Sequence, residues 1–370
     1  MRILDRYVLR ELLIPFGYCL GGFWIFWAAF DLFMELAEFQ RNNCTASDVA
    51  QFYALRTPEM VVMVLPIAFL LALLYALTDM ARHHELTAIR AAGVSLWRIS
   101  VPYLGLGFVL SLVVFVLNEF YVASNAEAAQ LLKHRRQAVA NATDSKQWKR
   151  QWGFTNTRQN RIWYMDAYNL TTSEMLRPHV TWLLDGGTKC EIWAERGIYR
   201  DGAWVFYNVQ ENMFSITPGD FNSNITNIMT IPFSETPAQI RSEIKIGKIS
   251  DLRDVNRTQL SIQEILGYLR LHPERSEKNP MLETKLQGRF ATPWTCLVVV
   301  LIALPFGAPA GRRNVFVGVA SSIVICFAYF VIVQLALALG TRGTLPPWLA
   351  AWAPNLLFGG TGVALTFRVR

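Results

Sequence analysis

The sequence predicts a membrane protein with six transmembrane α-helices and one inserted domain of β-jelly-roll-like type outside the cytoplasm. Charged residues make up only 17% of the 370 residues, and hydrophobic residues make up 52%. A soluble protein carries about 25% charged residues. The charges are missing from long uninterrupted stretches, whereas the middle of the chain has ordinary polar sequence with strand-like alternation. This distribution is typical of membrane helices that flank a water-soluble insert.

Six apolar windows are long enough to cross a bilayer, which requires about 20 residues in a helix. They are residues 12–34, 60–78, 99–117, 290–311, 314–341 and 344–367. The windows divide the chain into a first transmembrane half (residues 1–122), an insert (123–281) and a second transmembrane half (282–370). The first apolar window is too long for a signal peptide and lacks a small-residue cleavage site, so we expect it to remain as a span.

The distribution of arginines predicts the orientation. Ten lie in the short segments on one side of the membrane: Arg2, Arg6, Arg10, Arg82, Arg90, Arg98, Arg312, Arg313, Arg368 and Arg370. Three lie on the other side: Arg41, Arg56 and Arg342. Because basic residues favour the cytoplasmic side, both termini are expected in the cytoplasm and the insert outside it.

The insert shows the signals of a β-domain. Apolar residues alternate through 180–184 and 192–199, and Asp201-Gly202 separates two such runs. Asp-Gly between alternating runs is a strong β-hairpin signal. A short amphipathic helix is expected at 261–271, where Ser261 and Glu264 fit a capping box. Several short strands with such turns favour a sandwich or jelly roll.

The loop between the second and third windows is the most informative segment for function. Residues 80–93 are expected to contain a short helix with an apolar stripe that includes Leu86 and Ile89, and Glu85 projects from its polar side. Gly93 is placed to end the helix. Such a helix could insert into a groove of a cytoplasmic partner. It could instead anchor the loop in the membrane interface.

No pattern supports catalysis by the chain itself. The sequence contains no GxxxxGK[ST] or GxGxxG nucleotide-binding signature, no HExxH and no GxSxG, and its five histidines are scattered. We therefore expect no enzyme activity, no cofactor and no metal site, and the charge of +7 is assigned to topology rather than to nucleic acid. Cys44 and Cys190 lie outside the spans and could pair, although two unpaired thiols are the favoured interpretation.

Several segments resemble one family across nearly the whole chain. The stretch ELTAIRAAGVSLWRI resembles the cytoplasmic coupling segment of the lipopolysaccharide-export permeases (LptF/LptG, also YjgP/YjgQ). The opening ILDRYVLRELL, the segment from Pro58-Glu59 to Pro66, the hairpin at 194–204 and the Pro-Pro before the last window are also similar.

The resemblance implies a permease subunit of an ABC transporter in the bacterial inner membrane. Such a subunit pairs with a second permease of the same family and binds a cytoplasmic ABC ATPase dimer. The complex extracts lipopolysaccharide and passes it through the β-jelly roll to a periplasmic bridge protein. Glu85 matches the coupling carboxylate of the family, and Leu86, Ile89 and Arg90 would share its contact with the ATPase.

The resemblance also implies a lateral gate lined by the first and fifth spans. Position alone selects the candidate gate residues Phe26, Phe30, Asp31, Phe33, Arg41, Phe316 and Ile323. One departure concerns lipid phosphates, because some relatives carry a basic residue near the outer end of the first span. This chain carries acidic residues there, including Asp31 and Glu35. The partner permease, Arg41 or Arg56 could supply the cation, the lipid could carry fewer phosphates, or Asp31 could pair with a cation in a neighbouring span.

Two alternatives belong to other classes. The first is a non-transporting membrane receptor or assembly factor that displays the periplasmic β-domain. The second is a eukaryotic secretory-pathway protein, which rests on Asn-x-Ser/Thr tripeptides such as the one at Asn141. The sequence does not decide between the F-type and G-type permease, or between a homodimer and a heterodimer.

Overall fold

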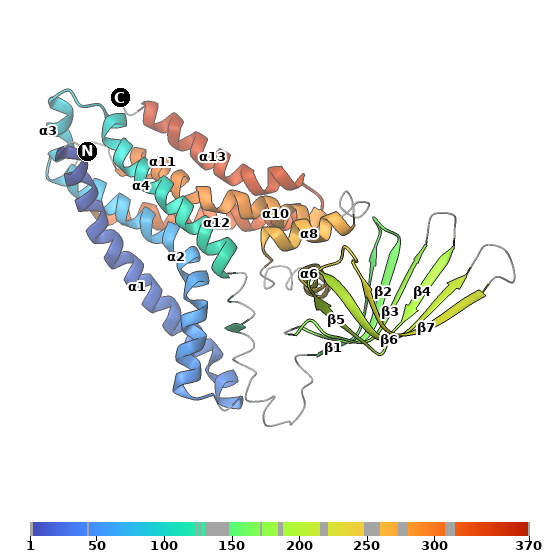
Figure 1. The fold of residues 1–370 in the computed structure, drawn as a ribbon. Helices are drawn as coiled ribbons and strands as arrows, with labels where there is room; N and C mark the ends of the chain where they lie inside the picture. The colour runs from blue at the N-terminus through green and yellow to red at the C-terminus, as the bar shows by residue number, and fades with distance from the viewer. Residues whose placement is uncertain are drawn as a thin grey trace. The chain divides into compact units, whose positions relative to one another are not determined.

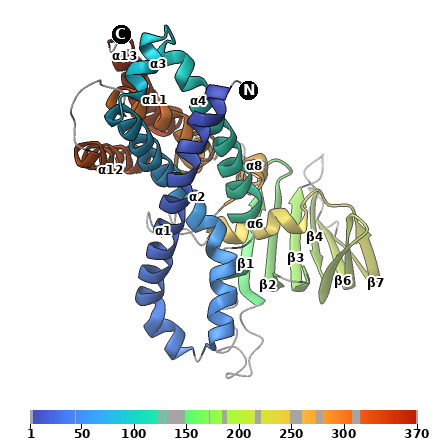
Figure 2. The same ribbon diagram turned by 90° about the vertical axis from the view of Figure 1, so that its left-hand side faces the viewer.

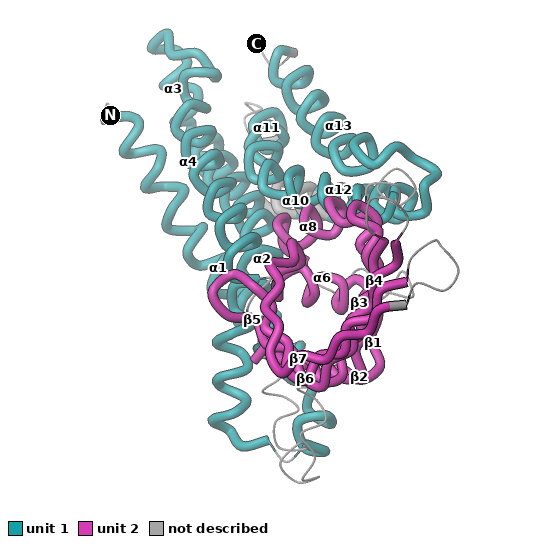
Figure 3. Tube along the Cα trace, turned by 45° about the vertical axis from the view of Figure 1, so that its right-hand side comes forward, with its two compact units in different colours: residues 1–133, 280–370 teal, residues 134–279 magenta. Residues whose placement is uncertain are grey.

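The computed structural model describes residues 3–42, 44–122, 125, 128–129, 148–170, 172–183, 188–214, 221–247, 260–272, 280–307 and 315–368. The chain forms two compact units, coloured separately in Figure 3. Unit 1 combines Met1–Lys133 with Pro280–Arg370, and unit 2 is His134–Asn279. The predicted insert, residues 123–281, contains unit 2.

Unit 1 is helical (Figure 1). Its elements are α1 (Ile3–Arg41), α2 (Ala46–Arg82), α3 (Glu85–Ala91), α4 (Leu96–Val116), the π-helix η1 (Leu117–Val122), α10 (Pro280–Ala291), the 3₁₀ turn η3 (Thr292–Trp294), α11 (Thr295–Gly307), α12 (Val315–Thr341) and α13 (Pro347–Arg368). Four helical stretches of the described residues are long and apolar enough to cross a membrane: Ile3–Arg41, Ala46–Arg82, Leu96–Val122 and Pro280–Pro305. The described part of the structure therefore contains four helices of the length and composition expected of membrane spans, and the count of six spans stays a prediction.

Helix α2 lies at the centre of the unit 1 core. Ala68, Phe69, Leu73, Leu74 and Leu77 are all fully buried, and α1, α11 and α12 pack around this helix. α1 and the first half of α2 run side by side as a long helical hairpin (Figure 2). Both helices extend well beyond the predicted apolar windows and include the polar residues on either side of them.

The fourth predicted span, residues 290–311, differs from the structure at its start. Helix begins earlier, at Pro280, and a 3₁₀ turn interrupts it at Thr292–Trp294. Pro293 causes the interruption because it has no N–H to donate to the preceding turn. The side chain of Asn355 donates a 2.8 Å hydrogen bond to the Ala291 carbonyl at this break, so that oxygen has a partner in the apolar interior.

Unit 2 is built on one antiparallel sheet of seven described strands. They are β1 (Trp148–Asn156), β2 (Arg161–Asn169), β3 (Met175–Leu183), β4 (Lys189–Trp193), β5 (Arg196–Arg200), β6 (Ala203–Phe214) and β7 (Phe221–Ile231). β4 and β5 both pair β3 on one side and β6 on the other, so they continue one another and the sheet is a meander. A jelly roll additionally requires Greek-key connections. The β-domain is confirmed, whereas the jelly roll stays a prediction.

The predicted hairpin is confirmed. β5 and β6 are joined by Asp201-Gly202, and Arg200 pairs with Ala203 across the turn. Asp201 and Gly202 both have positive φ, at 51° and 84°, which a two-residue type I′ turn requires.

Two helices accompany the sheet. α6 (Pro237–Gly247) lies within the curve of the strands in Figure 3, and its Ile240 and Ile244 pack into a core with Trp163, Trp204 and Phe206. The sequence did not indicate this helix. α8 (Ile262–Leu271) was predicted, and its capping box between Ser261 and Glu264 is confirmed in both directions.

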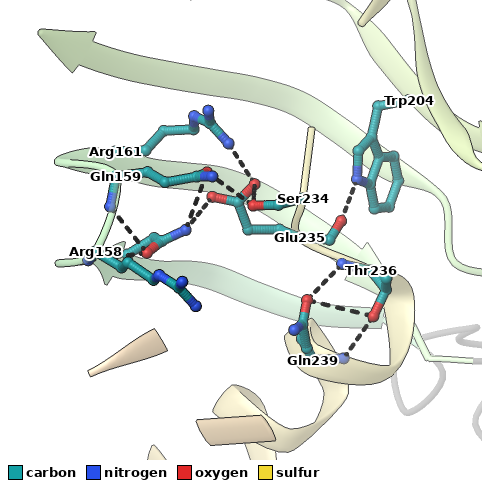
Figure 4. A network of polar contacts seen from close by, with 9 residues as sticks. Arg158, Gln159, Arg161, Trp204, Ser234, Glu235, Thr236 and Gln239 are labelled. Carbon is teal, nitrogen blue, oxygen red and sulfur yellow. Dashed lines mark hydrogen bonds and ion pairs between the residues drawn. The ribbon is translucent and has the colours of Figure 1, made fainter. Parts of the chain in front are cut away.

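A buried polar network ties the two ends of the sheet together (Figure 4). Glu235, which follows β7, is fully buried and pairs with Arg161 at the start of β2. Its other oxygen accepts a 2.8 Å hydrogen bond from Asn156 at the end of β1, and its backbone carbonyl accepts one of 2.7 Å from Trp204. Because Glu235 bonds to both β1 and β2, it fixes the segment between β7 and α6 against the opposite edge of the sheet.

Replacing Glu235 should therefore destabilise unit 2. Glu235→Ala leaves the Arg161 guanidinium buried without its carboxylate, which should lower the free energy of unfolding by about 3–5 kcal/mol. This loss of free energy is measured from cleavage within unit 2 when the full-length protein, in detergent, is treated with a protease across a urea series. Asp166→Ala is the matched control, because its ion pair with the exposed Arg177 should contribute less than about 1 kcal/mol. Equal effects of the two substitutions would contradict the structural role of Glu235.

Candidate coupling segment and gate surface

The predicted loop helix is present but shorter than residues 80–93. α2 continues through Arg82, a turn follows at His83-His84, and α3 begins at Glu85. His84 has a left-handed backbone, with φ of 61°, which redirects the chain between the two helices. Residues 80–82 therefore belong to the end of α2, and the segment that carries Glu85 is a separate seven-residue helix.

Apolar side chains anchor α3 to unit 1. Leu86 is only 4% exposed and belongs to the core built around α2, while Ile89 and Val94 pack against the same core. The resemblance suggested that Leu86 shares the contact with a partner. Because Leu86 is enclosed by its own chain, it positions the helix, and its contact with a partner stays a prediction.

The end of α3 has the geometry that the sequence predicted. Gly93 has φ of +83°, and the N–H groups of Gly93 and Val94 donate to the carbonyls of Arg90 and Ile89, at 3.0 and 3.3 Å. This 5→2 and 6→1 pattern is a Schellman motif, and the packing of Ile89 and Val94 against one core completes it.

The remaining surface of α3 is open and made of small residues. Thr87, Ala88 and Ala91 are exposed, and Arg90 is half-buried. Small side chains allow another backbone to approach closely, and Glu85 stands at one end of this surface. Glu85 is half-buried, and its Oε2 accepts a 2.8 Å hydrogen bond from the Tyr7 hydroxyl of α1.

A second polar contact lies beside the first. The Arg98 guanidinium, in the first turn of α4, is 3.0 and 3.1 Å from the two carboxylate oxygens of Asp5. Sequence reasoning missed both Tyr7 and Asp5. Nothing in their local pattern indicates partners that lie about eighty to ninety residues away in the chain, because such pairing depends on how the helices pack.

Three of the candidate gate residues share one face of α1. Phe26, Phe30 and Phe33 follow helical spacing and are 67%, 52% and 80% exposed. An unpaired row of phenylalanines on a membrane helix faces lipid or another membrane protein. The structure thus leaves this face of α1 available, which the gate prediction requires.

Asp31 does not belong to that open row. Its Oδ2 accepts hydrogen bonds from Arg56 at 2.8 Å and from the Tyr53 hydroxyl at 3.0 Å, both in α2. The prediction that Asp31 pairs with a cation in a neighbouring helix is borne out in this contact. Because Arg56 is paired with Asp31, the exposed Arg41 at the end of α1 is the stronger candidate for a lipid phosphate.

The candidate residues from the fifth span are in α12. Phe316 and Ile323 lie within this helix, but their side chains are outside the described residues. Further along α12, Val324, Phe327 and Leu335 are exposed apolar residues. α12 therefore also carries apolar side chains that its own chain does not cover.

Comparison with known families decides the identity. Residues 6–368 match the family described as lipopolysaccharide export system permease LptF/LptG. The chain belongs to the LptF/LptG family. The match spans both transmembrane halves and the β-domain, and no curated protein matches the chain. LptF/LptG proteins are inner-membrane permeases of lipopolysaccharide export, so this chain is a transport subunit and not itself an enzyme.

The described residues contain no group of three or more His, Cys, Asp or Glu side chains that could hold a metal ion. Cys44 and Cys190, which the sequence left open as a pair, form no disulfide with each other. Cys190 is buried beside Glu211, and burial raises the pKa of its thiol to about 12, so it stays protonated at neutral pH.

The Schellman motif at the end of α3 can be tested by substitution of Gly93. A Cβ added at Gly93 would meet open space, but the positive φ of this residue disfavours any side chain. Gly93→Ala should therefore destabilise the end of α3 by roughly 1 kcal/mol. Hydrogen exchange of the Gly93 and Val94 amides should become faster. Gly105→Ala in α4 is the matched control, since its Cβ also meets open space and its helical backbone favours alanine. Unchanged exchange in the Gly93 variant would contradict the assigned cap.

Proposed function

We propose that the chain is the permease subunit of an ABC transporter that extracts lipopolysaccharide from the inner membrane. In this proposal both termini and α3 face the cytoplasm, and unit 2 lies in the periplasm. A cytoplasmic ABC ATPase dimer supplies the energy, and a second LptF/LptG permease completes the membrane path. Unit 2 passes the lipid to a periplasmic bridge protein.

The geometry of α3 is the observation that carries this proposal. A short helix is anchored by Leu86, Ile89 and Val94, and it presents Glu85 beside a surface of small exposed residues. Oε2 of Glu85 is occupied by Tyr7, which leaves Oε1 to accept from a cation of the ATPase. A charge-assisted bond from an arginine has a defined geometry and suits the transmission of movement.

The exposed row on α1 supports a lateral gate. Acyl chains need a route without exposed backbone groups, which only helices provide in a bilayer. Phe26, Phe30 and Phe33 offer such a surface, and Phe327 offers a similar one on α12. In the proposed complex, α1 of one permease meets the corresponding α12 of the second permease, and lipid enters between them. Arg41, at the end of α1, is placed to meet a phosphate of the headgroup.

In this proposal, unit 2 shelters the acyl chains from water. Sheltering one CH₂ from water stabilises it by about 0.8 kcal/mol. Trp182, Cys190 and Met213 form one cross-strand row, in which Trp182 packs against the unit 2 core, Cys190 is buried and Met213 is exposed. This row supports passage of acyl chains along the inner face.

The alternative is a receptor or assembly factor that displays the β-domain without transport. The family match favours transport. Co-purification separates the two functions, because only a transporter of this kind requires an ATPase subunit bound at α3.

Glu85→Gln tests the coupling role. The amide keeps the shape but removes the charge, so ATPase association and ATP-driven lipid release from proteoliposomes should both fall, the latter by about tenfold or more if a charge-assisted bond of 1.5–3 kcal/mol is lost. Asp79→Asn, in the last turn of α2, is the matched control and should behave as the unmodified protein. If Glu85→Gln leaves both association and release unchanged, the proposed coupling is wrong.

Photo-crosslinking tests the gate surface. A photoreactive residue at Phe26, Phe30 or Phe33 should form adducts with labelled lipopolysaccharide during transport, whereas the same residue at the buried Leu12 should not. Adducts confined to α2 and to exposed positions of α13, such as Leu356, would place the lipid path elsewhere.

A further inference from the structure

Two polar contacts connect the first turns of α1 with the coupling segment, residues 85–99, which comprises α3 and the first turn of α4. The Tyr7 hydroxyl donates to Glu85 over 2.8 Å, and Arg98 contacts both oxygens of Asp5 over 3.0 and 3.1 Å. The four residues come from α1, α3 and α4, so the contacts bracket the segment on both sides. We call these four residues the N-terminal clamp.

We propose that the N-terminal clamp makes α1 move together with the coupling segment, so that it carries ATP-driven movement to the gate surface. This inference rests on the proposed function. Tyr7, Asp5 and Arg98 are positioning residues in it, because they act on α1 and on Glu85 rather than on lipid or ATP.

Packing of the same region supports the clamp. Val8, one residue after Tyr7, is buried in the unit 1 core together with Leu86 and Ile99. Leu4 packs against this core as well. The start of α1 is therefore held to the segment by apolar contacts, and the polar pairs fix its direction and register.

Tyr7 also orients the carboxylate that the ATPase would meet. With Oε2 of Glu85 bonded to Tyr7, the plane of the carboxylate is fixed and Oε1 is the oxygen left to accept from a partner. A guanidinium recognises a carboxylate with defined geometry, so a pre-oriented acceptor loses less freedom on binding.

α1 is long enough to connect the N-terminal clamp with the gate surface. α1 is one helix of 39 residues, which is about 58 Å at 1.5 Å per residue. Its first turns contain Asp5 and Tyr7 of the clamp, and the same helix carries Phe26, Phe30 and Phe33. Pro15 removes one backbone hydrogen bond, but the buried Leu12 and Phe16 pack on either side of it. A displacement of the first turns can therefore reach the phenylalanine row.

A charge reversal with rescue tests the clamp in the assembled transporter in proteoliposomes. Arg98→Asp opposes Asp5, and Asp5→Arg opposes Arg98, whereas Asp5→Arg combined with Arg98→Asp restores an opposite-charge pair. Each single variant should still bind the ATPase and hydrolyse ATP, while lipid released per ATP falls by roughly two- to fivefold, the factor to which a partly exposed ion pair corresponds. The double variant should recover most of the release.

Tyr7→Phe is the conservative second variant, because it keeps the ring and removes only the hydroxyl. It should also lower lipid release per ATP, measured in complexes that retain the bound ATPase. Equal release per ATP in the single variants and the unmodified protein would overturn the clamp, as would a double variant no better than its parents. If the charge variants fail to assemble, Tyr7→Phe alone decides, and unchanged release per ATP in it overturns the clamp.

The failure of the clamp is distinguishable from failure of the proposed function. If Glu85→Gln abolishes coupled transport but the clamp variants do not change it, only the clamp is wrong. If Glu85→Gln has no effect, the coupling proposal itself fails, whatever the clamp variants do.

Discussion

A seven-residue helix does not hold its shape in water, because its first turn costs more entropy than its few hydrogen bonds return. α3 therefore depends on tertiary packing, and three apolar residues provide it. Leu86 is enclosed in the unit 1 core, and Ile89 and Val94 close the helix against the same core at its Schellman end. This anchoring determines where Glu85 stands, and every functional proposal for the cytoplasmic side depends on that position. A force applied to Glu85 would act on the core of unit 1 rather than on a loose loop.

The need to pair buried backbone groups explains where polar side chains lie at irregular turns of the membrane helices. Where Pro293 interrupts the helix between α10 and α11, Asn355 donates to the Ala291 carbonyl, and Asn355 in turn accepts from Tyr329 over 2.6 Å. Where α4 passes into the π-helix η1, the buried Arg289 donates to the Asn118 carbonyl over 2.9 Å. Each irregular turn is thus paired with a polar side chain from a neighbouring helix, as a bilayer requires.

Much of the architecture could be predicted because it is encoded locally. Apolar windows predicted helices, Asp201-Gly202 predicted a hairpin and Ser261 with Glu264 predicted a helix start, since each depends on residues close in sequence. Gly93 predicted the end of α3 for the same reason. The contacts of Glu85 with Tyr7 and of Glu235 with Arg161 could not be predicted, because each joins residues more than seventy positions apart. The burial of Leu86 was also missed, since an apolar stripe does not say whether its own chain or a partner covers it. The six-span count, the jelly roll and the gate residues stay predictions.

We infer that α1 and the coupling segment move as one body when the ATPase works. Spin labels at the exposed Ile3 of α1 and the exposed Ala88 of α3 measure their separation in the assembled transporter, with and without ATP. A second pair spans the proposed gate, with one label at Phe33 of α1 and the other at the α12 position of the second permease that corresponds to Phe327. We predict that the distance between positions 3 and 88 stays constant while the distance between positions 33 and 327 changes with ATP. A change in the distance between positions 3 and 88, with no change between 33 and 327, would show that α1 and α3 do not move as one body.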